Sequence, residues 1–326
     1  SGAYAVPVAA GGQGVGYSCP TGPLFVAADN LDNAYVVTGG VVGTACGPGG
    51  YKAIVNLAAK TSALMRGSGC DVFGYGGYAK ATGDGTLVAF TGGAGYGGFQ
   101  LYVPALDSCI PAADPAEPYG VTVAADGNVI GLLRAFVNSS GNILGRFADP
   151  EVFYPGVSSA EYYNYAPYQD GALQNPTLND AGSLYYWAYP NYIDIVDVHH
   201  GTPALRFGLT ETVTNTVSPM AIDSSGQRIF LITNMGLTVV DLGNAPLSVG
   251  HFSQTSARAG DQIEIRGSGF ENGITATLGG VSASLSFTDS ETLTLTVPVT
   301  DAGPEDLVLT NLDGTTYTLQ NAITVQ

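Results

Sequence analysis

Residues 217–270 decide how this chain is organised, and they read VSPMAIDSSGQRIFLITNMGLTVVDLGNAPLSVGHFSQTSARAGDQIEIRGSGF. The first half alternates short apolar runs with polar turns, which predicts the strands Met220–Asp223, Arg228–Asn234 and Leu237–Leu242. This meander has the size of one propeller blade. After Pro246 the pattern changes and does not return. We therefore predict a repeat domain over residues 1–244 and a second domain over residues 245–326.

Four earlier copies of the blade pattern precede this stretch. The copies after the first, and the last blade, place an Asp or Ser beside or near a Gly between two apolar runs, a pairing that supplies the positive φ angles of a two-residue hairpin. The five turns lie at Asn33, Gly85, Gly127, Gly182 and Gly226. Their spacing is close to the period of about 40–50 residues of four-stranded blades. We predict an all-β chain whose N-terminal part is an irregular β-propeller with five blades. A β-sandwich would give similar strands without this period.

The composition limits which partners this protein can bind. The 46 glycines and 18 prolines suit short strands and tight turns, and the net charge is −17, from 27 acidic and 10 basic residues. Such an acidic protein repels nucleic acid and anionic membrane surfaces. No run of 18 apolar residues is present, so no membrane insertion is expected. Neutral glycans, extracellular proteins and divalent cations remain as partners.

Four cysteines, Cys19, Cys46, Cys70 and Cys109, all lie in the first third of the chain. None of their spacings is the C-x2-C of a zinc site. An even number in one region predicts two disulfides and an oxidising compartment. Three pairings are compatible with the sequence, and Cys19–Cys46 with Cys70–Cys109 keeps each bridge near one blade. Four buried thiols are the alternative. The first residue is Ser1, which we interpret as the site where a signal peptide was removed from an extracellular or surface protein.

The second domain carries a glycine-aspartate step, a strand and a G-S-G-F bend over residues 259–270, AGDQIEIRGSGF. Residues 276–281, 292–298 and 306–314 continue with a turn, a strand ending in Pro298 and a further strand. This pattern resembles the IPT/TIG family of immunoglobulin-like domains over about 80 residues. The resemblance implies an interaction or spacer module without catalytic residues. The physics agrees, because Ile263 and Ile265 alternate with polar neighbours, as expected for a strand with one buried face.

The N-terminal part resembles secreted bacterial β-propellers in general shape only. It contains no W-D pair, no G-H pair and no double glycine with a spaced aromatic pair, so its family is unassigned.

Aromatic residues are the densest candidate for a ligand site. The segment 161–170 reads EYYNYAPYQD, and Trp187, the only tryptophan, follows it. Exposed rings beside carboxylates and amides suit a sugar, whose apolar face stacks on a ring while its hydroxyls bind the polar groups. The alternative is that the rings pack between blades. The candidate ligand-binding residues are Tyr162, Tyr163, Tyr165, Tyr168 and Trp187.

Two places could hold a metal ion, and neither matches a fixed motif. Asp194 and Asp197 precede His199 and His200, and residues two apart on a strand share a face, so Asp197 and His199 could converge. A polar strand end explains the same residues. Residues 28–35, ADNLDNAY, offer Asp29, Asp32 and Asn33 to calcium, but the twelve-residue calcium loop is absent and a turn explains them. We therefore predict no resident cofactor.

For catalysis the sequence offers no G-x-S-x-G, and its three histidines have no placed nucleophile. We expect a non-catalytic protein that acts in adhesion, in glycan or protein binding, or in extracellular assembly. The alternative is a glycan hydrolase or lyase that uses two of the acidic residues.

The last blade is one strand short, and residues 3–9, AYAVPVA, are the only uncommitted strand-like segment. We predict that this segment pairs with the last blade. Pro7 removes one donor, which an outermost strand tolerates. Pairing within the chain would close a monomer, whereas pairing between chains would build a filament by strand exchange.

Overall fold

The computed structural model describes residues 23–38, 52–64, 78–91, 99–111, 121–132, 135–146, 176–214 and 220–326. The chain divides into two compact units, Ser1–Leu144 and Gly145–Gln326. Among the described residues every regular element is a strand, apart from the short 3-10 helix η1 (Pro104–Leu106), which confirms the all-β class. The predicted domain boundary between residues 244 and 245 stays a prediction.

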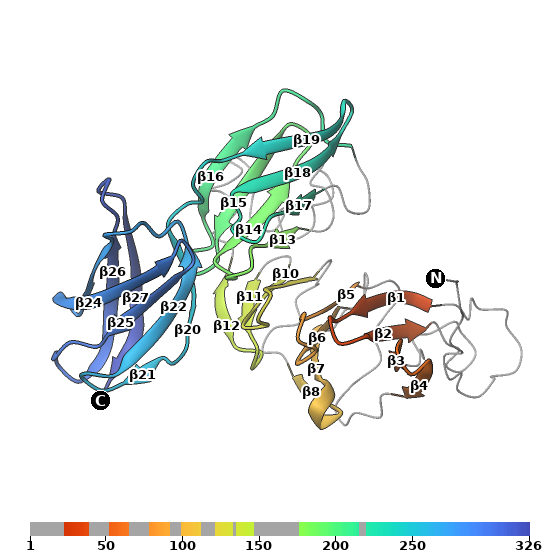
Figure 1. Cartoon of the computed structure of the whole chain (residues 1–326), viewed down its shortest axis with the longest axis horizontal. Coiled ribbons are helices and arrows are strands. Elements are labelled where there is room, and N and C mark those ends of the chain that lie inside the picture. Colours follow the sequence, from red (N-terminus) through yellow and green to blue (C-terminus); the bar gives the residue numbers. More distant parts are fainter. Residues whose placement is uncertain are drawn as a thin grey trace, which may run out of the picture. The chain divides into compact units, whose positions relative to one another are not determined.

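Five antiparallel sheets follow one another along the chain, each with its strands in chain order (Figure 1). The first sheet contains β1 (Pro23–Ala28), β2 (Asn33–Thr38), β3 (Lys52–Asn56) and β4 (Thr61–Leu64). The second contains β5 (Tyr78–Ala81), β6 (Val88–Thr91), β7 (Phe99–Val103) and β8 (Ser108–Pro111). The third contains β9 (Val121–Val123), β10 (Val129–Leu132), β11 (Ala135–Asn138) and β12 (Ile143–Arg146). The next two contain β13 (Thr177–Leu178), β14 (Leu184–Ala188), β15 (Tyr192–Asp197) and β16 (Pro203–Gly208); and β17 (Met220–Ile222), β18 (Arg228–Thr233) and β19 (Gly236–Asp241). These sheets are the predicted propeller-like blades.

Four of the predicted turn glycines have the same backbone geometry. Gly85, Gly127, Gly182 and Gly226 have φ angles of 68°, 72°, 65° and 71°, a region that glycine enters without strain. The turn is longer than the predicted two-residue hairpin. In the second blade Thr82 donates its backbone N–H to the Leu87 carbonyl at 2.9 Å, so the loop spans residues 83–86. Within this loop the Asp84 carboxylate accepts a hydrogen bond from the backbone N–H of Thr86, at 3.0 Å.

Consecutive blades share apolar clusters, which is how propeller blades pack. One cluster takes Tyr35 from the first sheet and Phe90 from the second, and another takes Leu101 from the second and Ile130 from the third. In the second unit, β13–β16 and β17–β19 share a cluster that includes the fully buried Ile195 and Ile229. Each fully buried aliphatic side chain of this kind contributes roughly 1.5–3 kcal/mol.

Within the described residues the last blade has three strands, as predicted, while the four sheets before it have four. The strand bounds agree with the sequence-based ones to within one residue at each end. The predicted fourth strand, residues 3–9, lies outside the described residues.

Of the four cysteines, only Cys109 lies in the described part of the chain. It is 9% exposed, in β8, and it is disulfide-bonded. Cys19, Cys46 and Cys70 lie outside the described residues, so the pairing stays a prediction.

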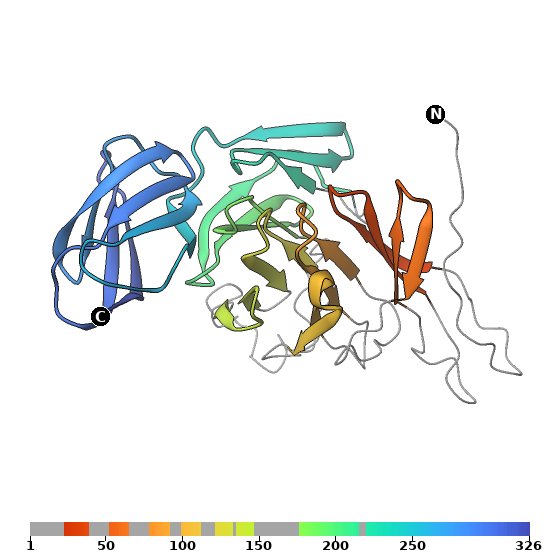
Figure 2. The same ribbon diagram turned by 60° about the horizontal axis from the view of Figure 1, so that its bottom comes forward.

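The C-terminal strands form an immunoglobulin-like β-sandwich (Figures 1 and 2). The strand order is β20-β22-β25-β24-β23-β26-β27-β21. The strands are β20 (Ser248–Phe252), β21 (Ser256–Ala257), β22 (Gln262–Ser268), β23 (Thr275–Leu278), β24 (Val281–Asp289), β25 (Thr292–Thr296), β26 (Gly303–Thr310) and β27 (Thr316–Val325). The long β24 joins the two layers, because residues 281–283 pair with β23 and residues 284–289 pair with β25.

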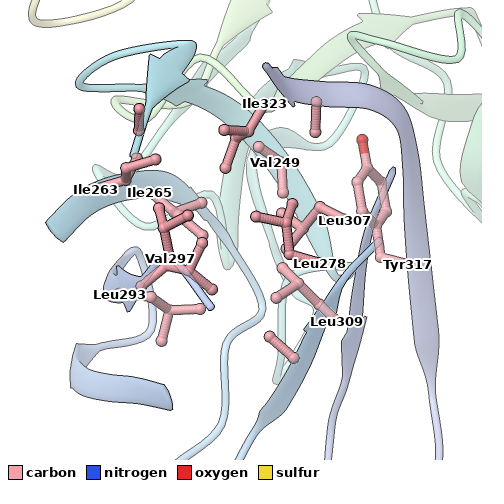
Figure 3. Close-up of a cluster of buried hydrophobic side chains, with 14 of the residues drawn as sticks. Val249, Ile263, Ile265, Leu278, Leu293, Val297, Leu307, Leu309, Tyr317 and Ile323 are labelled. Carbon is pink, nitrogen blue, oxygen red and sulfur yellow. The ribbon is translucent and has the colours of Figure 1, made fainter. Parts of the chain in front are cut away.

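The core of the sandwich follows the predicted alternation (Figure 3). Ile263 and Ile265 are fully buried, while their neighbours Gln262 and Glu264 are exposed. The glycine bend also forms as predicted. Gly269 has a φ of 66°, and a Cβ atom at this position would meet the Ala245 carbonyl, so the bend requires glycine there.

Candidate functional site

The turn after strand β15 contains Asp197, His199 and His200, three of the residues singled out in the sequence. Asp197 donates its backbone N–H to the Thr202 carbonyl at 2.9 Å, and Gly201, with a φ of 64°, donates to the Asp197 carbonyl at 2.8 Å. The chain therefore turns back at Asp197. Strand β15 ends at Asp197, so the alternation that could have brought Asp197 and His199 to one face does not extend to His199.

The carboxylate of Asp197 is the centre of a buried polar cluster between this blade and the sandwich. Only 4% of Asp197 is exposed. Its oxygens accept hydrogen bonds from the Ser248 hydroxyl, from the His200 backbone N–H at 2.7 Å and from the Tyr317 hydroxyl at 3.4 Å, while His200 Nδ1 lies 2.8 Å away. Burial raises the pKa of Asp197, but the donors from His200 and Ser248 outweigh burial and lower it. Asp197 is therefore ionised at neutral pH.

The two histidines bind the sandwich through backbone carbonyls. His199 Nε2 lies 2.9 Å from the Gly250 carbonyl, and burial lowers the pKa of His199, so its neutral form donates there. His200 Nε2 lies 2.9 Å from the Thr318 carbonyl. Both ring nitrogens of His200 thus face acceptors, which only the doubly protonated imidazolium satisfies. The hydrogen bond to Asp197 raises the pKa of His200, and burial opposes this only in part.

A series of buried serine hydroxyls extends the polar contact between this blade and the sandwich. The Ser183 hydroxyl, in the turn before β14, donates to the Ser268 hydroxyl at 2.9 Å, and Ser268 donates to the Pro246 carbonyl at 2.8 Å. The Ser248 hydroxyl also lies 3.1 Å from the Ser183 carbonyl. All three serines are fully buried. Every hydroxyl in this series has a partner, as a stable buried polar network requires. We refer to Asp197, His199, His200, Tyr317 and the three serines as the junction.

The order of the polar groups at the junction decides what chemistry it can perform. A catalytic triad needs the imidazole between the serine and the carboxylate, so that the ring takes the serine proton. Here the carboxylate of Asp197 lies between Ser248 and His200. Ser248 has an ionised carboxylate as its acceptor and no imidazole within hydrogen-bond reach in the described structure. The arrangement attaches the β13–β16 blade to the sandwich, and its order differs from that of a catalytic triad.

Asp194, the fourth metal candidate, lies on the opposite face of β15 from Asp197. It is 3% exposed, and both of its carboxylate oxygens bind the Arg206 guanidinium, at 2.6 and 2.8 Å. Arg206 also covers the ring of Tyr192, 4.5 Å from its centroid. Within the described residues no three His, Cys, Asp or Glu side chains are grouped so that they could hold a metal ion.

Trp187 lies in a ladder of aromatic rings on the same face as Asp194. Its ring stacks on Tyr189 at 6.3 Å and meets Tyr185 edge-on at 5.9 Å, and Tyr189 stacks on Tyr192 at 4.3 Å. Trp187 is 6% exposed, so a ligand would meet its neighbours before its own ring. Tyr162, Tyr163, Tyr165 and Tyr168 lie outside the described residues, and the predicted ligand site stays a prediction.

Asp29, in the calcium candidate, caps its own turn. One carboxylate oxygen accepts the backbone N–H of Leu31 at 2.8 Å and of Asn33 at 2.9 Å, and the other accepts the Asn33 amide at 3.0 Å and the Tyr35 hydroxyl at 2.9 Å. Burial raises the pKa of Asp29, but these donors lower it overall. Asp32 takes the left-handed conformation, with a φ of 62°. These residues form a turn, which was the other interpretation of the sequence.

Glu291, which the sequence gives no reason to single out, has an unusual environment. In the turn between β24 and β25 its Oε1 is buried without a hydrogen-bond partner in the described structure, and Oε2 lies 3.6 Å from Arg266 Nη2. Burial raises its pKa to about 7; Arg266 opposes this, and the carboxylates of Asp180, Asp289 and Asp223 add to it.

The last blade carries an exposed apolar surface on β18 and β19. The exposed fractions are 43% for Ile232, 78% for Met235, 66% for Leu237 and 52% for Val239. Ile232 pairs directly with Leu237, and Val239 is two residues further, so these three share one face. We call these four residues the β19 patch. The alternation in residues 231–240, LITNMGLTVV, predicts the two strands. Only the packing in the structure shows which face of these strands is buried and which is exposed.

No helix among the described residues is long and apolar enough to cross a membrane. No curated protein matches the chain. Solved structures with local similarity include a γ-CGTase from alkalophilic Bacillus clarkii, with 18% identity over 44% of this chain and 24% of that one and a TM-score of 0.25. Another is an auxiliary nutrient binding protein from Bacteroides ovatus, with 21% identity over 24% of this chain and 21% of that one and a TM-score of 0.22. This chain therefore spans about a quarter or less of the length of either protein.

The family comparison concerns the sandwich, whose core and glycine bend are described above. Residues 247–325 match the model of the IPT/TIG domain family, as the resemblance of residues 259–270 implied. The similarity to the IPT/TIG family thus covers the sandwich, residues 247–325.

Proposed function

We propose that this chain is a non-catalytic extracellular or surface protein that acts by binding and assembly, and that the β19 patch is one of its contact surfaces. The observation that carries the proposal is the exposure of Ile232, Leu237 and Val239 side by side on one sheet face. Contiguous exposed apolar surface is characteristic of interaction sites. The IPT/TIG domain fits such a role.

The polar groups that could perform chemistry support the same conclusion. In the described residues the candidates Asp194, Asp197, His199 and His200 are engaged by partners within the protein. An enzyme on this scaffold would need other acidic residues, placed as a pair around a substrate. The acidic composition and the predicted disulfides favour an extracellular location, and the tyrosine-rich segment 161–170 favours glycan as a ligand.

The test compares the full chain with the double variant Leu237→Lys/Val239→Lys. Binding is measured to immobilised neutral polysaccharides, to protein-coated surfaces and to immobilised copies of the chain itself. The matched control is Val299→Lys/Leu312→Lys, which changes two apolar residues of the sandwich that are 84% and 73% exposed. We expect the first variant to lose binding to at least one surface and the control to keep it. Equal binding by both variants, or binding to none of the surfaces by the full chain, would overturn the proposal.

A further inference from the structure

We infer that the β19 edge accepts residues 3–9 of a second copy of this chain as the fourth strand of the last blade. The inference rests on the proposed function and names the partner of the β19 patch. Its starting point is the strand count. Four sheets contain four strands, and in each the fourth strand is hydrogen-bonded to the third, whereas in the last sheet no strand of the described structure pairs with the outer side of β19.

The backbone of β19 is arranged to receive such a strand. Leu242 donates its backbone N–H to the Gln227 carbonyl at 2.9 Å, which fixes the hydrogen-bonding phase of the β18–β19 pair. In an antiparallel pair the bonded residues alternate with residues whose N–H and C=O point away from the partner. By this alternation Leu237, Val239 and Asp241 turn their backbone groups to the open edge. An edge of this kind is a template for another strand.

Residues 3–9 fit this edge in one phase only. Pro7 has no N–H, so it must lie among the residues that face away from β19, together with Ala3, Ala5 and Ala9. Tyr4, Val6 and Val8 then bind β19 opposite Leu237 and Val239. Directly opposed residues place their side chains on the same face of the sheet. The three large side chains of the segment therefore cover the β19 patch, and its small side chains take the other face.

Charge also favours this occupant. The chain has a net charge of −17, so two copies repel each other. Residues 1–22 contain no charged side chain, so this segment approaches an acidic neighbour without adding to the repulsion. Residues 11–16, GGQGVG, supply a flexible connection.

The exposed β19 edge is open to a second copy of the chain. Leu237 and Val239 are 66% and 52% exposed in the single chain, so no described part of the same molecule covers them. A donor at residues 3–9 and an acceptor at β19 are different surfaces. The contact is therefore head-to-tail, and it continues from copy to copy into a filament.

The experiment separates donor from acceptor. Removal of residues 1–10 abolishes the donor, and Leu237→Lys/Val239→Lys blocks the acceptor. Sedimentation velocity and electron microscopy should show polymers for the full chain and for the control Val299→Lys/Leu312→Lys, and protomers for each impaired variant alone. Circular dichroism verifies that both variants are folded. An equimolar mixture of the two variants should form a complex of two chains and nothing larger, because one intact donor meets one intact acceptor.

Other outcomes overturn the inference. If the truncated chain still polymerises, β19 pairs with something other than residues 3–9. If the full chain is a monomer that both changes destabilise, the segment pairs within its own chain. If neither change affects assembly or stability, the segment is a tail. A monomer that still binds polysaccharide or protein through the β19 patch refutes strand exchange but leaves the proposed function intact.

Discussion

His200 Nδ1 lies 2.8 Å from Oδ1 of Asp197, and the same oxygen accepts the His200 backbone N–H at 2.7 Å. One carboxylate oxygen thus fixes both the ring and the backbone of a residue whose other ring nitrogen reaches the sandwich. The junction therefore depends on the charge of His200.

Replacing His200 by Gln should reduce stability in a pH-dependent way. The folded pKa of His200 is raised above its unfolded value of about 6.5, so its contribution is fully present below that pH and is lost as pH rises through the folded pKa. The side chain is 43% exposed and screened by solvent, so we expect an effect of no more than about 1 kcal/mol at pH 5.5. Urea unfolding at pH 5.5 and pH 8.5 measures this loss of stability. A loss that is larger at pH 8.5 than at pH 5.5 would contradict the prediction.

Replacing Glu291 by Gln should stabilise the protein at high pH. The folded pKa of Glu291 is about 7 and exceeds the ordinary 4.5, so folding favours the protonated carboxyl. Its contribution to stability is fully present below pH 4.5 and is lost as the pH rises through 7. Gln is neutral throughout, and we expect a gain on the order of 1–3 kcal/mol at pH 8.5 and little change at pH 4.5. Denaturant unfolding at both pH values, with the exposed Glu264→Gln as control, gives the result. Equal effects at the two pH values would show that the charge of Glu291 is not responsible.

Gly226→Ala should cost more stability than Gly243→Ala. The φ angles are 71° and 73°, so both variants incur the same backbone strain of roughly 1–2 kcal/mol. Only at Gly226 does a new Cβ meet the Tyr186 hydroxyl, which donates to the Gly226 carbonyl at 2.7 Å; nothing lies within 4 Å of a Cβ at Gly243. The difference in free energy of unfolding isolates that contact. Identical values would mean that Tyr186 moves aside without cost.

If the tyrosine-rich segment binds sugar, Tyr163→Ala/Tyr165→Ala/Tyr168→Ala should abolish retention on immobilised polysaccharide and leave the melting temperature unchanged. Stacking on ring faces supplies the affinity, and Ala removes it. Tyr→Phe replacements at the same positions keep the rings and should retain most of the binding. A large loss of thermal stability in the Ala variant would instead place these rings in the core.

Local patterns were sufficient to predict much of the fold. The Asp-Gly pairs at residues 84–85 and 126–127 located their turns, and the alternation at Ile263 and Ile265 identified a buried face, because both signals act over a few residues. The length of the turns was wrong, since hydrogen bonds such as Thr82 to Leu87 extend them. The junction could not be predicted, because Ser248 and Asp197 are far apart in sequence and meet only when two sheets pack. The raised pKa of Glu291 likewise depends in part on the charges of Asp180 and Asp223, which lie on distant turns.

The junction places Asp197, His199 and His200 on a single turn. A force that pulls the sandwich away from the blade therefore loads the contacts of this turn in parallel with those of Ser183, in the turn before β14. Because these contacts share the load, the attachment should withstand tension up to a threshold force and then rupture in one step.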